Sequence, residues 1–263
     1  MKIAHEAPLA IFDLVQEVTD YDYFLVHLFE ENEKYLQKAL ESVKKNRHTI
    51  LDNSIFELGH SFDADRFATW VERLKPTEYI IPDVLEDAEN TVSKVKHWVE
   101  TYDQIPGRTI GVVQGKSYEE IIWCYKEIAP LVDKIAFSFD YSCLLPKQPS
   151  LHMATIECEY MWGRVDLLHS LDFAGIIDRN KPHHLLGCFL PQEFEQYRAL
   201  TWIDTLDTSN PVVHGINNIR YESHGLYTKV KTKLIDYMDA DLDVVQGIDI
   251  MYNIKKFREF ACG

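Results

Sequence analysis

Eight short apolar segments recur along the chain, and longer amphipathic segments separate them. The first lies around Ile3, and the others cover residues 23–29, 48–52, 79–83, 109–114, 134–139, 184–188 and 203–207. The segments IGVVQ and KIAFSF are apolar on both faces, as parallel strands covered by helices are. Eight strands that alternate with helices favour a (β/α)8 (TIM) barrel over an open sheet. We therefore predict an α/β fold with residues 1–263 as a single TIM-barrel domain.

The amphipathic segments have the spacing of helices with one apolar face. They cover residues 31–46, 63–74, 87–102 and 118–128, and in the second Phe67, Val71 and Leu74 form one stripe. Ser117 precedes the fourth segment with Glu120 three residues on, which predicts a capping box. The stretch 141–182 is longer than the other connections, so we expect an insertion there with a helix near residues 153–169. Roughly the last 45 residues are expected to form a helical C-terminal extension.

Composition indicates a globular chain without a membrane span. Hydrophobic residues make up 46% of the chain, but no run approaches the roughly 18 consecutive apolar residues of a membrane helix. The residues after Met1 lack the long apolar stretch of a secretory signal. The five cysteines have no CxxC spacing, which argues against a compact zinc site and fits reduced thiols. We expect a cytoplasmic protein that binds no membrane, metal or cofactor.

The formal net charge is −15, from 42 acidic and 27 basic residues. Such a charge opposes nucleic-acid binding over the whole surface but leaves room for a local basic groove. The candidate groove residues are Lys116, Arg220, Lys229, Lys231 and Lys233. The alternative is that these side chains lie on solvated helix faces and bind nothing.

Polar residues follow several of the predicted strands. They are Asp52, Asp83, Gln114 with Gly115, Asp140 and Asp207. Active sites of parallel barrels lie at the carboxyl ends of the strands, so this recurrence indicates a site, although each residue alone could be a turn or helix cap. Clustered carboxylates suit a divalent metal, an acid/base pair at a glycosidic bond, or a nucleophile that forms a glycosyl ester. Several histidines leave metal binding as an alternative, but no HxH or HExxH pattern supports it.

Four segments resemble the tRNA-guanine transglycosylase superfamily, TIM-barrel enzymes that exchange a guanine base for a 7-deazaguanine. LDNSIFELG (51–59) is similar to the family's Asp-Ser-Gly-Gly-aromatic-Gln stretch, and IGVVQGKSYEEI (110–121) to its Gly-Ile-Val-Gln-Gly-Gly segment. KPHHLLGCFLPQEF (181–194) resembles Pro-Arg-Tyr-Leu-Met-Gly-Val-Gly-Thr-Pro, and IDTLDTSNP (203–211) resembles Asp-Met-Phe-Asp-Cys-Val. The order of the four segments agrees with the family over about residues 1–215.

The resemblance implies a role for each matching residue. Asp207 is the expected nucleophile that attacks the ribosyl C1′, and Asp52 is the expected general acid/base for the proton of the base. Asp83 is expected to accept hydrogen bonds from the purine N1–H and exocyclic amine. The other implied substrate-binding residues, which read the carbonyl edge of the base or shape its pocket, are Gln114, Gly115, Phe56, Glu57, Ser138 and Leu186.

The chain departs from the family pattern in informative places. Ser54 and Ile55 replace the Gly-Gly pair, and Lys116 replaces the second Gly of Gln-Gly-Gly. The family's Cys-x-Cys-x-x-Cys zinc site and the C-terminal extension that carries it are missing. The chain therefore looks closest to the phage and bacterial 7-deazaguanine DNA transglycosylases (the DpdA-like branch).

We expect an enzyme that exchanges guanine in DNA for a deazapurine such as preQ0. Its partners are then DNA and that base, and a homodimer is left open. Three alternatives stay open as well: base exchange in tRNA, hydrolysis of a nucleoside or glycoside on a TIM barrel, and an inactive barrel that binds a partner protein. The presence of both Asp52 and Asp207 argues against the last alternative.

Overall fold

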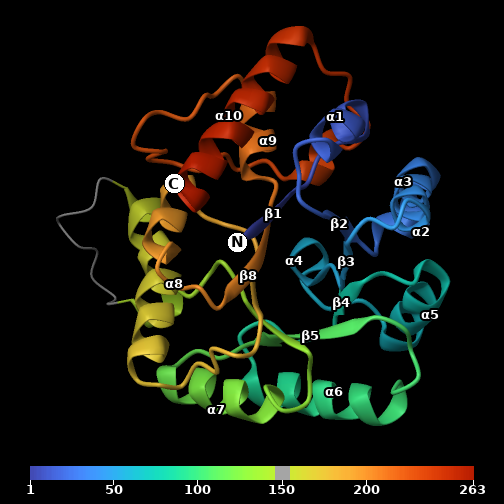
Figure 1. Cartoon of the computed structure of the whole chain (residues 1–263), viewed down its shortest axis with the longest axis vertical. Helices are drawn as coiled ribbons and strands as arrows, with labels where there is room; N and C mark the ends of the chain where they lie inside the picture. Colours follow the sequence, from blue (N-terminus) through green and yellow to red (C-terminus); the bar gives the residue numbers. More distant parts are fainter. Residues whose placement is uncertain (146–154) are drawn as a thin grey trace. The chain divides into compact units, whose positions relative to one another are not determined.

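The computed structural model describes residues 1–145 and 155–263, and among these it contains eight strands (Figure 1). The strands are β1 (Lys2–His5), β2 (Asp22–Leu25), β3 (Thr49–Asp52), β4 (Glu78–Ile80), β5 (Arg108–Val113), β6 (Lys134–Phe137), β7 (His183–Leu185) and β8 (Ile203–Thr208). They form one sheet in the order β1-β8-β7-β6-β5-β4-β3-β2, and the registered pairs are parallel. This order, in which successive strands are neighbours, confirms the predicted (β/α)8 fold class.

Helices connect most of the strands. The α-helices are α1 (Phe12–Gln16), α2 (Leu28–Glu31), α3 (Glu33–Lys44), α4 (Ile55–Leu58), α5 (Ala64–Leu74), α6 (Ala88–Thr101), α7 (Tyr118–Ile128), α8 (Ile156–Phe173), α9 (Asn210–Ile216) and α10 (Val244–Cys262). The 3-10 helices are η1 (Leu9–Ile11), η2 (Ser142–Leu144), η3 (Pro191–Tyr197) and η4 (Leu234–Tyr237). Within the described ranges, no helix combines the length and the apolar character that crossing a membrane requires.

Local hydrogen bonds decide where several predicted elements begin. The segment 23–29, predicted as one strand, is divided between β2 and α2. Ser117 caps α7, because its side chain accepts a hydrogen bond from the Glu120 N–H. The Glu120 carboxylate accepts from the Lys116 N–H at 2.7 Å instead of from Ser117, so the predicted capping box is only half formed.

The two long stretches contain helices, as the sequence predicts. Between β6 and β7, α8 runs from Ile156 to Phe173, and the predicted helix start at Met153 lies outside the described residues. In the C-terminal stretch, α10 is regular, whereas residues 217–243 before it are irregular apart from η4. The short connection from β7 to β8 is made by η3.

The chain divides into two compact units. Unit 1 contains Met1–Asp20, Ser138–Arg179 and Leu185–Gly263, and unit 2 contains Tyr21–Phe137 and Asn180–His184. In unit 2, β2 to β6 pair in sequence order, and the predicted apolar stripe of α5 is buried. In unit 1, β1 pairs with β8, and α9 lies beside α10 (Figure 1). That close packing needs Gly215, because a Cβ there would lie 2.5 Å from the Ile250 N.

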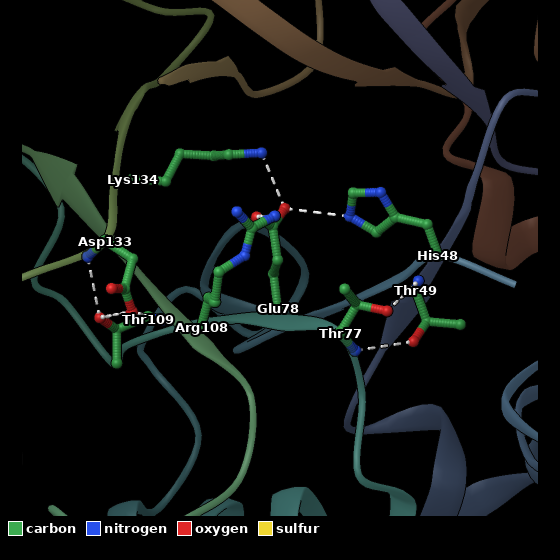
Figure 2. Close-up of polar contacts among 8 residues, drawn as sticks. All are labelled: His48, Thr49, Thr77, Glu78, Arg108, Thr109, Asp133 and Lys134. Carbon is green, nitrogen blue, oxygen red and sulfur yellow. Dashed lines mark hydrogen bonds and ion pairs between the residues drawn. The ribbon is translucent and has the colours of Figure 1, made fainter. Parts of the chain in front are cut away.

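A buried ionic cluster joins the beginnings of neighbouring strands in unit 2 (Figure 2). Its centre is Glu78, the first residue of β4. Lys134 Nζ lies 2.7 Å and His48 Nε2 lies 3.1 Å from Glu78 Oε2, and Arg108 pairs with Oε1. The side chains of Glu78 and Lys134 have an exposed fraction of 0%.

The cluster keeps Glu78 ionised. Burial by itself would raise the pKa of Glu78, but His48 and Lys134 outweigh burial and lower this pKa to about 2. The carboxylate therefore contributes stability that is fully present above its ordinary pKa of 4.5 and is lost as the pH falls through about 2.

Reciprocal hydrogen bonds also join the starts of these neighbouring strands (Figure 2). The backbone N–H of Thr49 donates to the Thr77 hydroxyl at 3.2 Å, and the N–H of Thr77 donates to the Thr49 hydroxyl at 3.1 Å. Thr109 and Asp133 are joined in the same way, by bonds of 2.8 to 3.1 Å. Polar side chains thus satisfy backbone donors that the sheet ladder leaves at the strand starts.

Replacing Lys134 with methionine should lower the free energy of unfolding by about 3–5 kcal/mol, because the buried Glu78 carboxylate then loses a buried partner. Chemical denaturation followed by circular dichroism measures the change. The control is Lys96→Met, which breaks the exposed pair between Lys96 and Glu127 and should cost at most about 1 kcal/mol. Equal losses in the two variants would contradict the stabilising role of the cluster.

Candidate active site

The polar residues predicted at strand ends do lie there in the structure. Asp52 is the last residue of β3, Asp207 lies near the end of β8, and Asp83 and Gln114 follow β4 and β5. All four are buried, with exposed fractions of 8%, 5%, 1% and 5% in that order. Asp140 differs, because it is exposed and its carboxylate caps a turn by accepting from the N–H two residues on. The four buried residues are therefore the candidate functional residues: Asp52, Asp83 and Gln114 belong to unit 2, and Asp207 belongs to unit 1.

In unit 2, Asp83 is the centre of a buried hydrogen-bonded cluster. Asn53 Nδ2 donates to Asp83 Oδ1 at 2.8 Å, and Gln114 Nε2 donates to Asp83 Oδ2 at 2.6 Å. Backbone groups orient both amides, since Asn53 Oδ1 accepts from the Ile55 N–H and Gln114 Oε1 accepts from the Glu86 N–H. Neither amide can turn over without losing its backbone bond. Both oxygens of Asp83 therefore act as acceptors.

The surroundings of Asp83 suit a ligand edge that carries two N–H donors. Burial raises the pKa of Asp83, and the hydrogen bonds from Asn53 and Gln114 act against that rise. A carboxylate has about four acceptor positions, so the two amide bonds do not exhaust them. A planar group with two adjacent N–H donors can therefore bind the same carboxylate, and it would compensate the buried charge.

Asn53 is a residue of this cluster that the sequence analysis missed. Its Nδ2 also donates to the Ile81 carbonyl at 3.0 Å, so it ties the end of β3 to the segment after β4. The available signal was its position, directly after Asp52 at the end of a predicted strand. In this arrangement Gln114 has a similar role, because its amide holds Asp83 in place.

His27, which follows β2, is a second polar residue outside the sequence prediction. Its backbone N–H donates to the Ser54 hydroxyl at 3.3 Å, and the side chain is buried. Neither ring nitrogen has a hydrogen-bond partner among the described residues. Burial lowers the pKa of His27, so the ring is neutral at pH 7 and offers one donor and one acceptor.

The other predicted substrate-binding residues of unit 2 have weaker structural support. Gly115 has φ +151°, and a Cβ there would lie 2.9 Å from the Cβ of Glu120, so the close approach of α7 requires glycine. Phe56 and Glu57 lie in α4, and Phe56 is 46% exposed.

In unit 1, a backbone N–H orients Asp207. The Gly187 N–H donates to Asp207 Oδ2 at 3.4 Å. Gly187 has φ +56°, the left-handed conformation that favours glycine, and a Cβ there would lie 3.2 Å from the Phe139 ring. Leu186 and Gly187 form the loop after β7, and Ser138 is half-buried after β6.

Arg164 of α8 holds this loop from within the protein. Its Nη1 donates to the Leu186 carbonyl at 2.9 Å, and its Nη2 donates to the Gly187 carbonyl at 2.8 Å. The Arg164 Nε donates to Glu193 Oε1 at 2.7 Å, and both side chains of this ion pair have an exposed fraction of 0%. Tyr197 donates its hydroxyl to the same oxygen at 2.6 Å. Arg164 therefore positions the loop whose N–H contacts Asp207, although no motif in the sequence indicated it.

The five predicted nucleic-acid-binding residues differ in their surroundings. Two of them pair with carboxylates: Lys116 lies 3.5 Å from Glu86, and Arg220 binds Asp249. The remaining three are Lys229, Lys231 and Lys233. Lys229 is half-buried, and the other two are exposed.

Metal and thiol chemistry find little support in the described part of the chain. There, no three or more His, Cys, Asp or Glu side chains are grouped in a way that could hold a metal ion. All five cysteines are free, and burial raises the pKa of Cys124 to about 11 and that of Cys188 to about 12. These two buried thiols stay protonated at neutral pH and are poor nucleophiles.

Arg164→Met should lower the free energy of unfolding by about 3–5 kcal/mol, because it leaves the buried Glu193 carboxylate without its cation. Arg179→Met is the matched control, since Arg179 pairs with Asp172 but is 68% exposed, and its loss should cost at most about 1 kcal/mol. Thermal and urea denaturation of both variants measure the difference. If Arg164→Met is as stable as the control, Arg164 does not hold the loop in the way described.

Comparison with known proteins assigns no family to the chain. A scan against models of protein families found no match, and a search of curated proteins found none either. The function of the protein is therefore inferred from its own residues and their geometry.

Proposed function

We propose that this protein is a glycosyltransferase that exchanges guanine in DNA for a 7-deazaguanine such as preQ0, through a covalent glycosyl ester on an aspartate. The observation that carries the proposal is the buried cluster of Asp83, Asn53 and Gln114 in unit 2. The resemblance of four sequence segments to the tRNA-guanine transglycosylase superfamily supports it.

The Asp83 cluster has the chemistry to select a guanine-type base. Guanine presents its N1–H and exocyclic amine as adjacent donors, and 7-deazaguanines keep both. Asp83 is fixed as an acceptor at both oxygens, so it can receive these two donors. Adenine presents an acceptor at N1, which would face the acceptor oxygens of Asp83 and form no hydrogen bond with them. An unpaired buried polar group costs about 1–3 kcal/mol or more, which is enough for strong discrimination.

The proposal assigns the covalent step to Asp207. Its carboxylate oxygen bonds to C1′ while the C1′–N9 bond breaks, and the electron pair leaves with guanine, which takes a proton from Asp52. The incoming deazapurine then returns a proton to Asp52 and displaces Asp207 from C1′. Both carboxyl groups end the cycle in their starting states, so no cofactor is consumed.

Two backbone conformations support the resemblance to the superfamily. Ser54 has φ +62°, which is uncommon for a residue with a side chain, and it occupies a position where the family motif has glycine. Gly187 has φ +56° and is a glycine in the motif as well. The local backbone of this chain is thus the one that glycine at both positions would favour.

Asp207→Asn should abolish base exchange, because a neutral amide does not attack C1′, while the nearly isosteric side chain leaves the fold intact. The assay incubates the protein with duplex or single-stranded DNA and labelled guanine and counts incorporation. Without an incoming base, denaturing mass spectrometry of the wild type should show a DNA adduct on Asp207.

The control for this prediction is Asp204→Asn on the same strand, which should keep exchange activity. Full activity in Asp207→Asn would rule out the covalent scheme. Parallel reactions with tRNA identify the polymer, since incorporation into tRNA alone would replace DNA as the substrate. Release of free base without incorporation would indicate a hydrolase.

Asp83→Asn should weaken binding of guanine by about 1–3 kcal/mol, because the new amide leaves a donor of the base or of the cluster unpaired. Isothermal titration calorimetry measures the affinity, and Asp87→Asn, at the half-buried cap of α6, is the control. Since burial raises the pKa of Asp83, wild-type affinity should fall as the pH is lowered through that raised pKa. An unchanged affinity in Asp83→Asn would show that the base binds elsewhere.

A further inference from the structure

Lys229 of unit 1 is a cation that lies against aromatic rings and forms no ion pair with the residues that the structure describes. Its Nζ lies 4.5 Å from the centroid of the Phe139 ring and 5.6 Å from that of Phe189. Among the described residues, Asp140 and Glu193 act on this ammonium electrostatically, but neither makes a hydrogen bond or an ion pair with its Nζ. Arg220, further back on the same segment, is bound by Asp249 and so lacks this property.

The segment that carries Lys229 is held in place by hydrogen bonds. The side chain of Gln192 donates to the Leu226 carbonyl at 2.6 Å and accepts from the Leu226 N–H at 3.1 Å. Thr155, the cap of α8, donates to the Tyr227 carbonyl. The Val230 N–H donates to the ring of buried His214 at 3.4 Å. These bonds come before and after Lys229, so its backbone is fixed.

The rings near Lys229 belong to a larger aromatic cluster. Phe139 and Phe189 meet edge to face with centroids 5.0 Å apart, and Tyr160 lies 5.7 Å from Phe189. Phe139 and Tyr160 are half-buried, so neither residue is fully enclosed by the protein. Phe139 follows β6 and Phe189 follows β7, which places both rings at the carboxyl ends of strands.

A half-buried ammonium without a directly paired carboxylate is costly, because water no longer solvates it fully. Burial lowers the pKa of Lys229 accordingly. Cation–π contacts with two rings recover only part of that cost. An anion bound at Lys229 would recover more, and the neighbouring half-buried aromatic side chains could stack a planar group. Both features occur together in a nucleotide of a nucleic-acid strand.

We propose that Lys229, Phe139, Phe189 and Tyr160 form a subsite for one nucleotide of the substrate strand, in which Lys229 contacts the phosphodiester and the rings stack a base. The proposal rests on the proposed function for the identity of the polymer as DNA. The sequence analysis predicted Lys229, Arg220, Lys231 and Lys233 as members of one basic groove. The proposal assigns the nucleotide contact to Lys229 alone among these four residues.

The test measures binding of fluorescein-labelled single-stranded DNA and RNA oligonucleotides over a series of salt concentrations. Lys229→Gln should reduce the slope of log affinity against log salt by about 0.7, the share of one phosphate on a single strand. Lys255→Gln, at an exposed lysine of α10 outside the predicted groove, is the control and should leave both affinity and slope unchanged. Lys229→Arg keeps the charge and should restore the slope.

The stacking half of the proposal has a different signature. Phe139→Leu should lower affinity by about tenfold or more with the salt slope unchanged, because a neutral contact is lost. A Lys229→Gln slope equal to the wild-type slope would overturn the subsite, as would wild-type protein that binds neither oligonucleotide. The Asp207 adduct assay reports on base exchange separately, so a covalent adduct together with an unchanged slope would refute only the subsite. Tighter binding of RNA than of DNA through Lys229 would keep the subsite and change the polymer.

Discussion

The buried ion pair between Glu78 and Lys134 is the interaction on which the sheet of unit 2 depends. Two charges are removed from water there, at a cost of several kcal/mol each, and the cost is offset because His48 and Arg108 bind the same carboxylate. Glu78, Arg108 and Lys134 begin β4, β5 and β6. Apolar side chains at these positions would tolerate several strand offsets, whereas one ionic cluster is satisfied only when the three strands start together. The cluster therefore specifies register as well as stability.

The two ends of these strands are organised for different purposes. At the amino ends, charges and hydroxyls bind one another, so the polar groups are satisfied within the protein. At the carboxyl ends, Asp83 is held by two amides whose orientation the backbone determines, and its acceptor capacity is not exhausted. Burial disfavours the ionised form of the Asp83 carboxylate and raises its pKa, so keeping the charge there costs free energy. A ligand with two donors offsets that cost, which links the burial of Asp83 to the selectivity that we propose.

Unit 1 uses a buried ion pair in another way. The side chains of Arg164 and Glu193 are fully buried, and Arg164 also donates hydrogen bonds to two carbonyls of the loop after β7. The same side chain therefore stabilises the unit and sets the position of the Gly187 N–H on Asp207. A planar guanidinium can make these contacts together, which a lysine cannot. Stability and site geometry are consequently coupled in this unit.

The sequence by itself determined the strand and helix pattern, the fold class and the polar residues at the strand ends. These follow from local information: apolar periodicity, helix caps such as Ser117, and the rule that parallel strands end at one edge. It failed where a short segment was divided between β2 and α2, and where Glu120 bonded Lys116 instead of closing a capping box.

Only the tertiary structure decided what surrounds each candidate residue. Asn53 and Asp83 are 30 residues apart, and Arg164 and Glu193 are 29 apart, so no local pattern reports their contacts. Lys229 and Lys231 look alike in the sequence, yet only Lys229 lies over the rings of Phe139 and Phe189. Burial and partners are properties of the folded chain, and they determine whether a carboxylate or an ammonium caps a turn, stabilises a sheet or is left to bind a ligand.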